Sequence, residues 1–206
     1  MDAATIIQKA GIIGYVLLFL SVISLSIIIE KIMTLRLSKL VPQEDVRLIV
    51  EFVSDGNIAD AVELCKRRKN FISLVILDAL KNIGELNKDN FLSSFETAAK
   101  RKFIELERGL PLLATIAAVS PLLGLVGTVL GMIKIFGVLT VGNTSIGNPQ
   151  QLSAGISEAL LTTVFGLLVA IPAIVAYNLF QKKLDLIAAE VESTGVLIGN
   201  NFKSSR

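Results

Sequence analysis

One acidic side chain stands alone within a long apolar segment of this chain. Glu158 is the only charged residue between Ala154 and Phe180, and Lys134 is the only one between Leu110 and Val141. An ionised carboxylate in hydrocarbon is unfavourable unless it is paired, hydrated or protonated, and it should face protein or a water-filled cavity. A carboxyl group in this position can take up and release a proton, so Glu158 is the first candidate for a functional residue.

The composition excludes most other chemistry. The 206 residues include no histidine and a single cysteine, so the chain builds no Ser-His-Asp or Cys-His nucleophile pair and no histidine-containing metal site. Cys65 has no cysteine to pair with and is most simply a small buried apolar residue. The 20 basic and 18 acidic side chains nearly balance, which does not indicate nucleic-acid binding. We expect no catalytic residue, no metal and no cofactor.

Small and hydroxylated residues share the face of Glu158. At about 100° per residue, Thr162 lies about 40° around a helix from Glu158, and Gly155 and Gly166 lie within about 80°. In the segment 110–141, small residues recur at steps of three and four, namely Ala117, Ser120, Gly124, Gly127 or Thr128, and Gly131. Such stripes allow helices to approach closely, and they indicate either a polar functional seam or packing alone.

Lys134 has two interpretations. It lies about six residues from the outer end of its segment, so its side chain can extend to the lipid headgroups, or it can neutralise Glu158. Pro121 and Pro172 also lie within apolar segments. We expect them to kink their helices or to free carbonyl groups for hydrogen bonds with hydroxyls and water.

Three apolar segments are long enough to carry these residues through a membrane, which takes about 20 residues in a helix. They comprise residues 10–29, 110–141 and 154–180. Residues 30–108, by contrast, carry 14 basic and 13 acidic side chains. No small-residue cleavage site follows the first segment, so it is expected to be a retained anchor, with Glu30 and Lys31 among the headgroups.

Basic residues mark one side of each segment. They follow the first at Lys31, Arg36 and Lys39, precede the second at Lys100, Arg101, Lys102 and Arg108, and follow the third at Lys182 and Lys183. The positive-inside rule therefore places residues 30–109 and 181–206 in the cytoplasm. Residues 1–9 and the uncharged loop 142–153 are expected outside.

The charged insert has a helical pattern throughout. Pro42 and the acids after it begin a helix that ends at Asp55 and Gly56, and further helices cover residues 57–68 and 71–83, where Gly84 closes the last. From Lys88 the apolar pattern continues into the second span, which predicts one long helix.

The start of the third span and a C-terminal helix complete the expected fold. Asn148 as cap and Pro149 as first residue begin the third span, which places Glu158 about 13 Å inside it. The tail after Lys182 has the pattern of another amphipathic helix. The predicted fold is an all-α integral membrane protein with three transmembrane helices, of which the second and third extend into a helical cytoplasmic domain.

Two stretches carry a family resemblance. Residues 120–132 (SPLLGLVGTVLGM) and 155–173 (GISEALLTTVFGLLVAIPA) closely resemble the signatures of the MotA/TolQ/ExbB proton-channel family. The three-span layout with a large cytoplasmic insert is similar to the ExbB/TolQ branch, since MotA-type members have four spans. The insert itself carries no such signature.

The resemblance implies an inner-membrane, energy-transducing subunit with its N-terminus in the periplasm and its C-terminus in the cytoplasm. Family members form a homopentamer whose second and third spans line a pore. That pore holds a dimeric, single-span ExbD/TolR-like partner with a proton-carrying aspartate, and the assembly drives a TonB- or TolA-like protein for outer-membrane transport or envelope maintenance. By position, Glu158 matches the family's intramembrane acid, and Thr128 and Thr163 match its pore threonines. The helical wheel places Thr162 on the face of Glu158 and favours it as the functional threonine of the third span. The family motif favours Thr163 as the pore threonine instead.

Other functions remain open at this point. A self-sufficient proton or ion channel or transporter would conduct without a partner, and a structural membrane scaffold would tolerate alanine at Glu158, Thr128 and Thr163. The residues do not distinguish an ExbB-like from a TolQ-like role.

Overall fold

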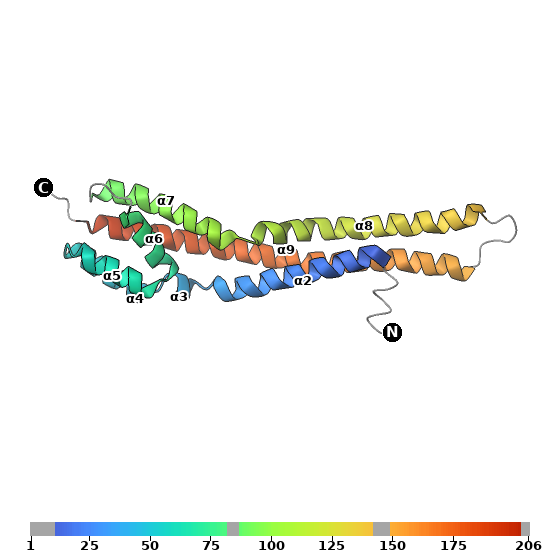
Figure 1. The fold of residues 1–206 in the computed structure, drawn as a ribbon, viewed down its shortest axis with the longest axis horizontal. Coiled ribbons are helices and arrows are strands. Elements are labelled where there is room, and N and C mark those ends of the chain that lie inside the picture. Colours follow the sequence, from blue (N-terminus) through green and yellow to red (C-terminus); the bar gives the residue numbers. More distant parts are fainter. Residues whose placement is uncertain (1–10, 82–86, 142–148, 203–206) are drawn as a thin grey trace. The chain divides into compact units, whose positions relative to one another are not determined.

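The computed structural model describes residues 11–81, 87–141 and 149–202, and the elements among them are all helices (Figure 1). The chain divides into two compact units. The first comprises Met1–Lys31 and Gly109–Leu179, and the second comprises Ile32–Arg108 and Phe180–Arg206. The all-α class is confirmed. The segments 1–9 and 142–148, which are predicted to lie outside the membrane, fall outside the described residues.

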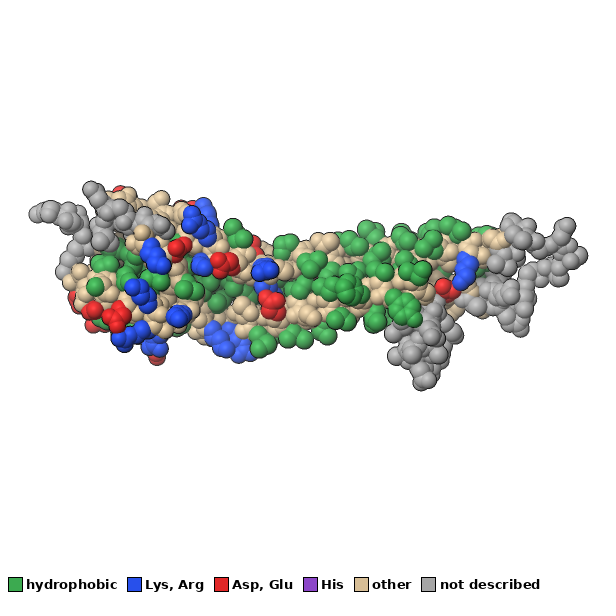
Figure 2. Space-filling model, viewed as in Figure 1, with side chains coloured by type: hydrophobic (Ala, Val, Ile, Leu, Met, Phe, Trp, Pro, Cys, Tyr) green, Lys and Arg blue, Asp and Glu red, His purple; other side chains and the backbone are tan. Residues whose placement is uncertain are grey.

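Three described helices are long and apolar enough to cross a membrane. They are α2 (Gly11–Thr34), α8 (Leu110–Val141) and α9 (Pro149–Asn200). Only 22%, 28% and 33% of the residues in their apolar windows are buried within the chain. Figure 2 shows charged side chains gathered over the second unit, whereas hydrophobic side chains cover much of the spans. Apolar surface of this extent requires lipid or partner helices around it, which confirms the three-span membrane protein predicted from the sequence.

The helices of the first unit have a defined direction relative to one another. α8 runs antiparallel to α9, because Ser120 lies beside Gly166 at one end and Ile135 lies beside Gly155 at the other. α2 runs parallel to α9. Its first residue, Gly11, lies beside Glu158, and farther along the two helices border a shared cavity of about 220 Å³, lined by Gly14, Leu17, Leu18, Ser21, Phe165, Leu168 and Val169. α2 and α9 therefore begin at the same side of the unit.

A break at Arg108 and Gly109 separates α7 (Lys88–Glu107) from α8. Arg108 has an extended ψ of 131°, and Gly109 has a φ of +90°, a conformation that favours glycine. Pro111 then occupies the first turn of α8, where a missing N–H costs nothing. The prediction of one continuous helix from Lys88 into the second span is wrong, because the backbone leaves the helical region at these two residues.

α9 continues without interruption from Pro149 to Asn200, with Pro172 inside it. The tail that the sequence suggested as another helix is the end of this same helix, so the third span does extend into the second unit. Beyond Lys182 its buried apolar residues recur at helical spacing, at Leu184, Ile187, Val191 and Ile198. Asn148, the expected cap, lies outside the described residues.

The second unit is a bundle of short helices. Its helices before α7 are α3 (Leu37–Leu40), α4 (Gln43–Ser54), α5 (Ile58–Arg68) and α6 (Phe71–Lys81). α6 packs against both α5 and α7, which explains its nearly continuous apolar sequence. The predicted starts and ends of α4 and α5 are confirmed, since Pro42 precedes α4, Asp55 follows it and Asn57 precedes α5. Residues 82–86, where α6 was expected to end, lie outside the described residues.

Lys31 differs from its predicted place among the headgroups. The side chain of Glu30 is 63% exposed, but that of Lys31 is only 2% exposed, with its Nζ 3.4 Å from Glu30 Oε1. Protein therefore covers the lysine stem. A buried ammonium group requires polar partners, and the neighbouring carboxylate supplies one of them.

Cys65 lies in the core of the second unit, as predicted, with none of its surface exposed. Polar groups close to this core hold α4 to α5 and α6. The carboxylate of Asp45, itself buried, accepts a hydrogen bond from Asn70 at 2.7 Å and pairs with Arg68 at 3.0 Å. A buried carboxylate needs such partners to offset its lost hydration. Burial raises the pKa of the Cys65 thiol from its ordinary value of 9.0 to about 11.

We predict that Cys65 resists alkylation in the folded protein. The thiolate is the reactive form, so near pH 9.0 the buried thiol should react with iodoacetamide at least about tenfold more slowly than the same thiol in unfolded protein. Because the folded state keeps a proton that the unfolded state loses, this thiol should also lower the free energy of unfolding as pH rises from 9.0 towards about 11. Equal alkylation rates in the folded and unfolded protein would contradict the prediction.

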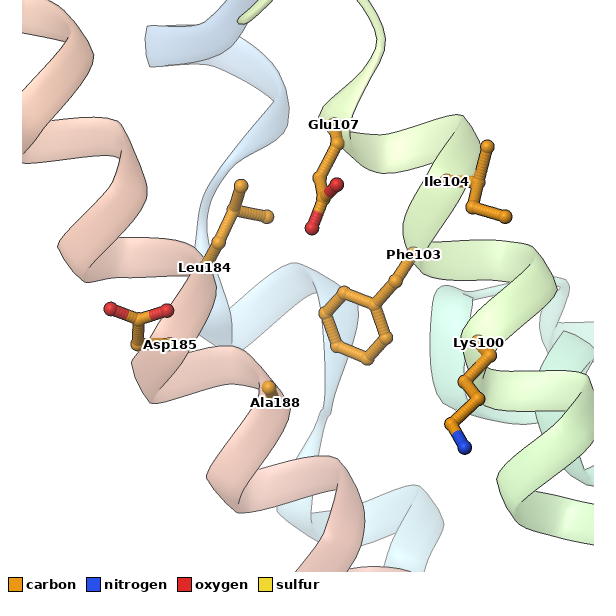
Figure 3. Close-up of a pocket in the computed structure, with 7 residues that line it drawn as sticks. All are labelled: Lys100, Phe103, Ile104, Glu107, Leu184, Asp185 and Ala188. Carbon is orange, nitrogen blue, oxygen red and sulfur yellow. The ribbon is translucent and has the colours of Figure 1, made fainter.

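The second unit also contains an open pocket of about 460 Å³ between α7 and the end of α9 (Figure 3). Phe103 projects from α7 towards α9, and Leu184 and Ala188 line the opposite side. Lys100, Glu107 and Asp185 contribute charge to the lining.

Candidate functional site

Glycines bring α8 and α9 into close contact. A Cβ added at Gly166 would lie 2.6 Å from the Ser120 carbonyl oxygen, and one added at Gly124 would lie 3.0 Å from the Thr162 carbonyl oxygen. A Cβ added at Gly131 would likewise lie 2.9 Å from the Ala159 side chain. At Gly166 the contacting atom is backbone and cannot rotate away, so this position requires glycine. At Gly124 and Gly131 a larger residue would force the helices apart.

The contact has a regular register along both helices. On α8 it involves Ser120, Gly124, Gly127, Gly131 and Ile135, and on α9 it involves Gly155, Ala159, Thr162, Thr163 and Gly166. Both sets advance in steps of three and four residues, as one face of a helix does, except that Thr162 and Thr163 are adjacent. We call this contact the small-residue seam. It is where the sequence placed its helix-packing glycines.

The hydroxyl groups of Thr162 and Thr163 both lie within hydrogen-bonding distance of the Gly124 carbonyl on α8. Thr162 is only 2% exposed, packs against Gly127, and donates a hydrogen bond to the Ala159 carbonyl at 2.7 Å, with a longer one to the Gly124 carbonyl at 3.4 Å. Thr163 donates to the same Gly124 carbonyl at 3.2 Å. The two threonines favoured separately by the helical wheel and by the family motif therefore share one acceptor.

Thr128 is not part of this arrangement. Its hydroxyl group donates to the Leu125 carbonyl of its own helix at 2.6 Å, and its side chain is half-buried. Among the described residues, no hydrogen bond joins Thr128 to Thr163. Pro172 lies inside α9 with an exposed side chain, also away from the seam.

Glu158 and Lys134 meet near the end of the seam. Lys134 Nζ lies 3.6 Å from Glu158 Oε2, and the two side chains are 72% and 32% exposed. Lys134 was expected either to extend to the lipid headgroups or to neutralise Glu158, and in the structure it forms the ion pair with Glu158. The carboxylate thus has a cationic partner while part of its surface remains open to a proton donor or acceptor.

Gly11 lies on the other side of the same carboxylate. A Cβ at this position would come within 3.1 Å of Glu158 Oε1, and Gly11 has a φ of +60°. Sequence analysis did not single out Gly11, because its proximity to Glu158 depends on how α2 packs against α9. The one available signal was a glycine at the start of an apolar segment, which is common.

The carboxyl group of Glu158 is the group of this site that can take up and release a proton. The site places a partly exposed carboxylate, an ammonium group and two hydroxyl groups on helices that are otherwise apolar. In the structure both hydroxyl groups donate to backbone carbonyls, and the charged partner of Glu158 is Lys134. Within the described residues, no group of three or more acidic, cysteine or histidine side chains is placed to hold a metal ion.

Comparison with known families identifies a match that includes the whole seam. The sequence profile of the MotA/TolQ/ExbB proton channel family matches residues 67–193. These residues contain α6 to α8 and most of α9, and therefore Lys134, Glu158 and both threonines.

Individual relatives extend the similarity over most of the chain. The biopolymer transport protein ExbB-like 1 of Synechocystis sp. is 34% identical over 190 residues, covering 88% of this chain and 73% of the relative. The biopolymer transport protein exbB1 of Vibrio cholerae is 29% identical, covering 91% of this chain and 82% of the relative. The Tol-Pal system protein TolQ of Haemophilus influenzae is 38% identical over 96 residues, or 47% of this chain and 41% of the relative.

Proposed function

Because the chain belongs to the MotA/TolQ/ExbB proton channel family, in its ExbB/TolQ branch, we propose that it is a subunit of an inner-membrane motor driven by protons. In this motor, Glu158 exchanges protons together with an ExbD/TolR-like single-span partner. The assembly energises a TonB- or TolA-like protein that spans the envelope. The match is to a family of proton channels, not of enzymes.

The observation that carries this proposal is the position of Glu158. It lies in an apolar helix, beside a seam of hydroxyl groups and glycines, with a counter-ion on the facing helix. An ionisable residue within a membrane span is retained for function far more often than for stability. A structural scaffold has no use for a carboxylate in this place.

The energetics favour a motor that uses many protons. One charge that crosses a potential of 100 mV releases about 2.3 kcal/mol. That energy is enough to change the balance between two arrangements of a partner helix, but not to unfold a protein. Repeated protonation of a carboxyl group is therefore a suitable source of repeated movement.

We propose that a homopentamer of this chain surrounds the partner, with α8 and α9 facing the pore. The parallel course of α2 and α9 supports an N-terminus and a 142–153 loop on the same, periplasmic, side. Thr128, whose hydroxyl group donates to the Leu125 carbonyl of its own helix, would then face a neighbouring subunit or the partner. The large exposed apolar surface of the three spans supports further helices and lipid around each subunit.

An ExbB-like role is favoured over a TolQ-like one. The relatives named ExbB-like 1, ExbB-like 3 and exbB1 align with 85–91% of this chain, whereas the TolQ of Haemophilus influenzae aligns with 47%. Biopolymer uptake is therefore the first process to assay, and envelope maintenance the second.

The test of the proposed function is reconstitution of the full chain into liposomes, alone and with an ExbD/TolR-like single-span protein from the same organism. A motor subunit should pass protons down an imposed pH gradient only when the partner and its aspartate are present. Conduction by this chain alone would instead favour the alternative of a self-sufficient proton or ion channel.

A further inference from the structure

The only two charged side chains between Gly109 and Leu179 are paired with each other. They belong to different helices, Lys134 to α8 and Glu158 to α9, and approach to 3.6 Å. A lysine that only extended to the headgroups would have no reason to point at the one acid of the facing helix. The pairing therefore requires an explanation beyond the snorkelling of a long side chain.

The small-residue seam fixes this pair in place. Gly131 against Ala159 and Ile135 against Gly155 bracket Lys134 and Glu158. At Gly131 an added Cβ would lie 2.9 Å from the Ala159 side chain, and at Gly155 one would lie 2.9 Å from Ile135 Cδ1. Helices in such close contact cannot slide by a residue without collisions, so Lys134 stays opposite Glu158.

α2, the helix of the first span, lies against the carboxylate on the side away from Lys134. A Cβ added at Gly11 of α2 would lie 3.1 Å from Glu158 Oε1, so a side chain there would press on this oxygen. Among the described residues, Lys134 is the charged group that faces Glu158, and Gly11 adds none from α2. One carboxylate oxygen is thus directed at a cation and the other at a glycine.

We propose that Lys134 is a positioning residue that holds Glu158 ionised and directed towards α8 between proton uptake events. This inference rests on the proposed role of Glu158 as the proton-exchanging group. When a proton arrives, the carboxyl group becomes neutral, the ion pair is lost, and Lys134 is released. The ammonium group thereby links the protonation state of α9 to the position of a side chain on α8.

The experiment measures how much of Glu158 is protonated, without any partner. Dicyclohexylcarbodiimide enters apolar regions of proteins and adds to a protonated carboxyl group to give an O-acylisourea. This adduct rearranges to a stable acylurea or reacts with a nearby amine such as that of Lys134, forming an amide and releasing dicyclohexylurea. Mass spectrometry locates both products, and labelling of Glu158 is their sum. In the full chain in membranes near neutral pH, Lys134→Met should increase labelling of Glu158 by about fivefold or more, because the ionised form loses its partner. Lys134→Arg, which keeps the charge, should label as the unmodified chain does.

A matched control separates this effect from the general loss of a lysine. Lys100 is 73% exposed, as exposed as Lys134, and pairs with Glu96 in the second unit. Lys100→Met should leave Glu158 labelling unchanged, and Glu158→Gln should remove it. Equal labelling of Glu158 in the unmodified chain and Lys134→Met would overturn the proposal, as would a failure of Lys134→Arg to restore the low level in folded protein.

The result is separable from the proposed function. If Lys134→Met changes the labelling but the reconstituted complex passes no protons, the role of Lys134 is supported and the proposed motor function is contradicted. If the complex passes protons and the labelling is unchanged, the motor stands and Lys134 has no part in holding Glu158.

Discussion

Replacing Glu158 by glutamine is expected to abolish proton-coupled work while the protein still assembles. Glutamine keeps the shape and polarity of the side chain, but its amide neither takes up nor releases a proton near neutral pH. Proton flux through the complex reconstituted with its single-span partner should fall to the level of the partner alone. In cells, the uptake or envelope process that depends on the complex should be lost.

Glu158→Asp is the matched control for this prediction. It retains the carboxyl group on a shorter side chain and lengthens the distance to Lys134, so it should keep part of the flux. The amount of each variant in the membrane, and its co-purification with the partner, should equal those of the unmodified chain. Undiminished flux in a Glu158→Gln complex of normal composition would show that the proton takes another path.

Replacing Gly166 by valine is expected to prevent α8 and α9 from packing. The new Cβ would lie 2.6 Å from the Ser120 carbonyl oxygen and 3.2 Å from the Gly124 Cα, and backbone atoms cannot rotate away. Overpacking of this kind typically costs about 1–3 kcal/mol, and in a seam built on backbone contact the helices must separate. The amount of folded protein extracted in mild detergent and its thermal unfolding temperature should both fall.

Gly137→Ala provides the comparison for Gly166→Val. Gly137 lies in α8, and a Cβ added there meets nothing within 4 Å. Alanine favours a helix by about 1 kcal/mol over glycine, so this variant should unfold at the same temperature or a higher one. If Gly166→Val were as stable as Gly137→Ala, the close contact between the two helices would not exist in the membrane.

The spans and the short helices follow closely from local sequence. The length of an apolar segment depends on nearby residues only. The same is true of the helix starts and ends at Pro42, Gly56 and Asn57. Nearby residues also indicate the break between α7 and α8, since Gly109 and Pro111 are typical of a helix end followed by a new helix start. It was missed because the apolar pattern continues across it.

The site shows where local patterns stop being informative. The three- and four-residue spacing of the glycines predicted faces that could pack, and the intramembrane position of Glu158 marked it for function. Which partner Lys134 would take depended on the register of α8 against α9, and the proximity of Gly11 depended on the direction of α2. Burial of Lys31 was missed for the same reason, because long-range packing leaves no periodic signal in the chain.

The central claim is that Glu158 gains and loses a proton as the motor works. Infrared difference spectroscopy of the reconstituted complex, recorded as the external pH is lowered under a membrane potential, measures this directly through the carbonyl stretch of a protonated carboxyl group. We predict a band that grows with proton flux, is absent in Glu158→Gln, and appears together with a loss of carboxylate absorption. A spectrum with the same carboxyl bands in Glu158→Gln as in the unmodified complex, at pH values where protons flow, would contradict the account.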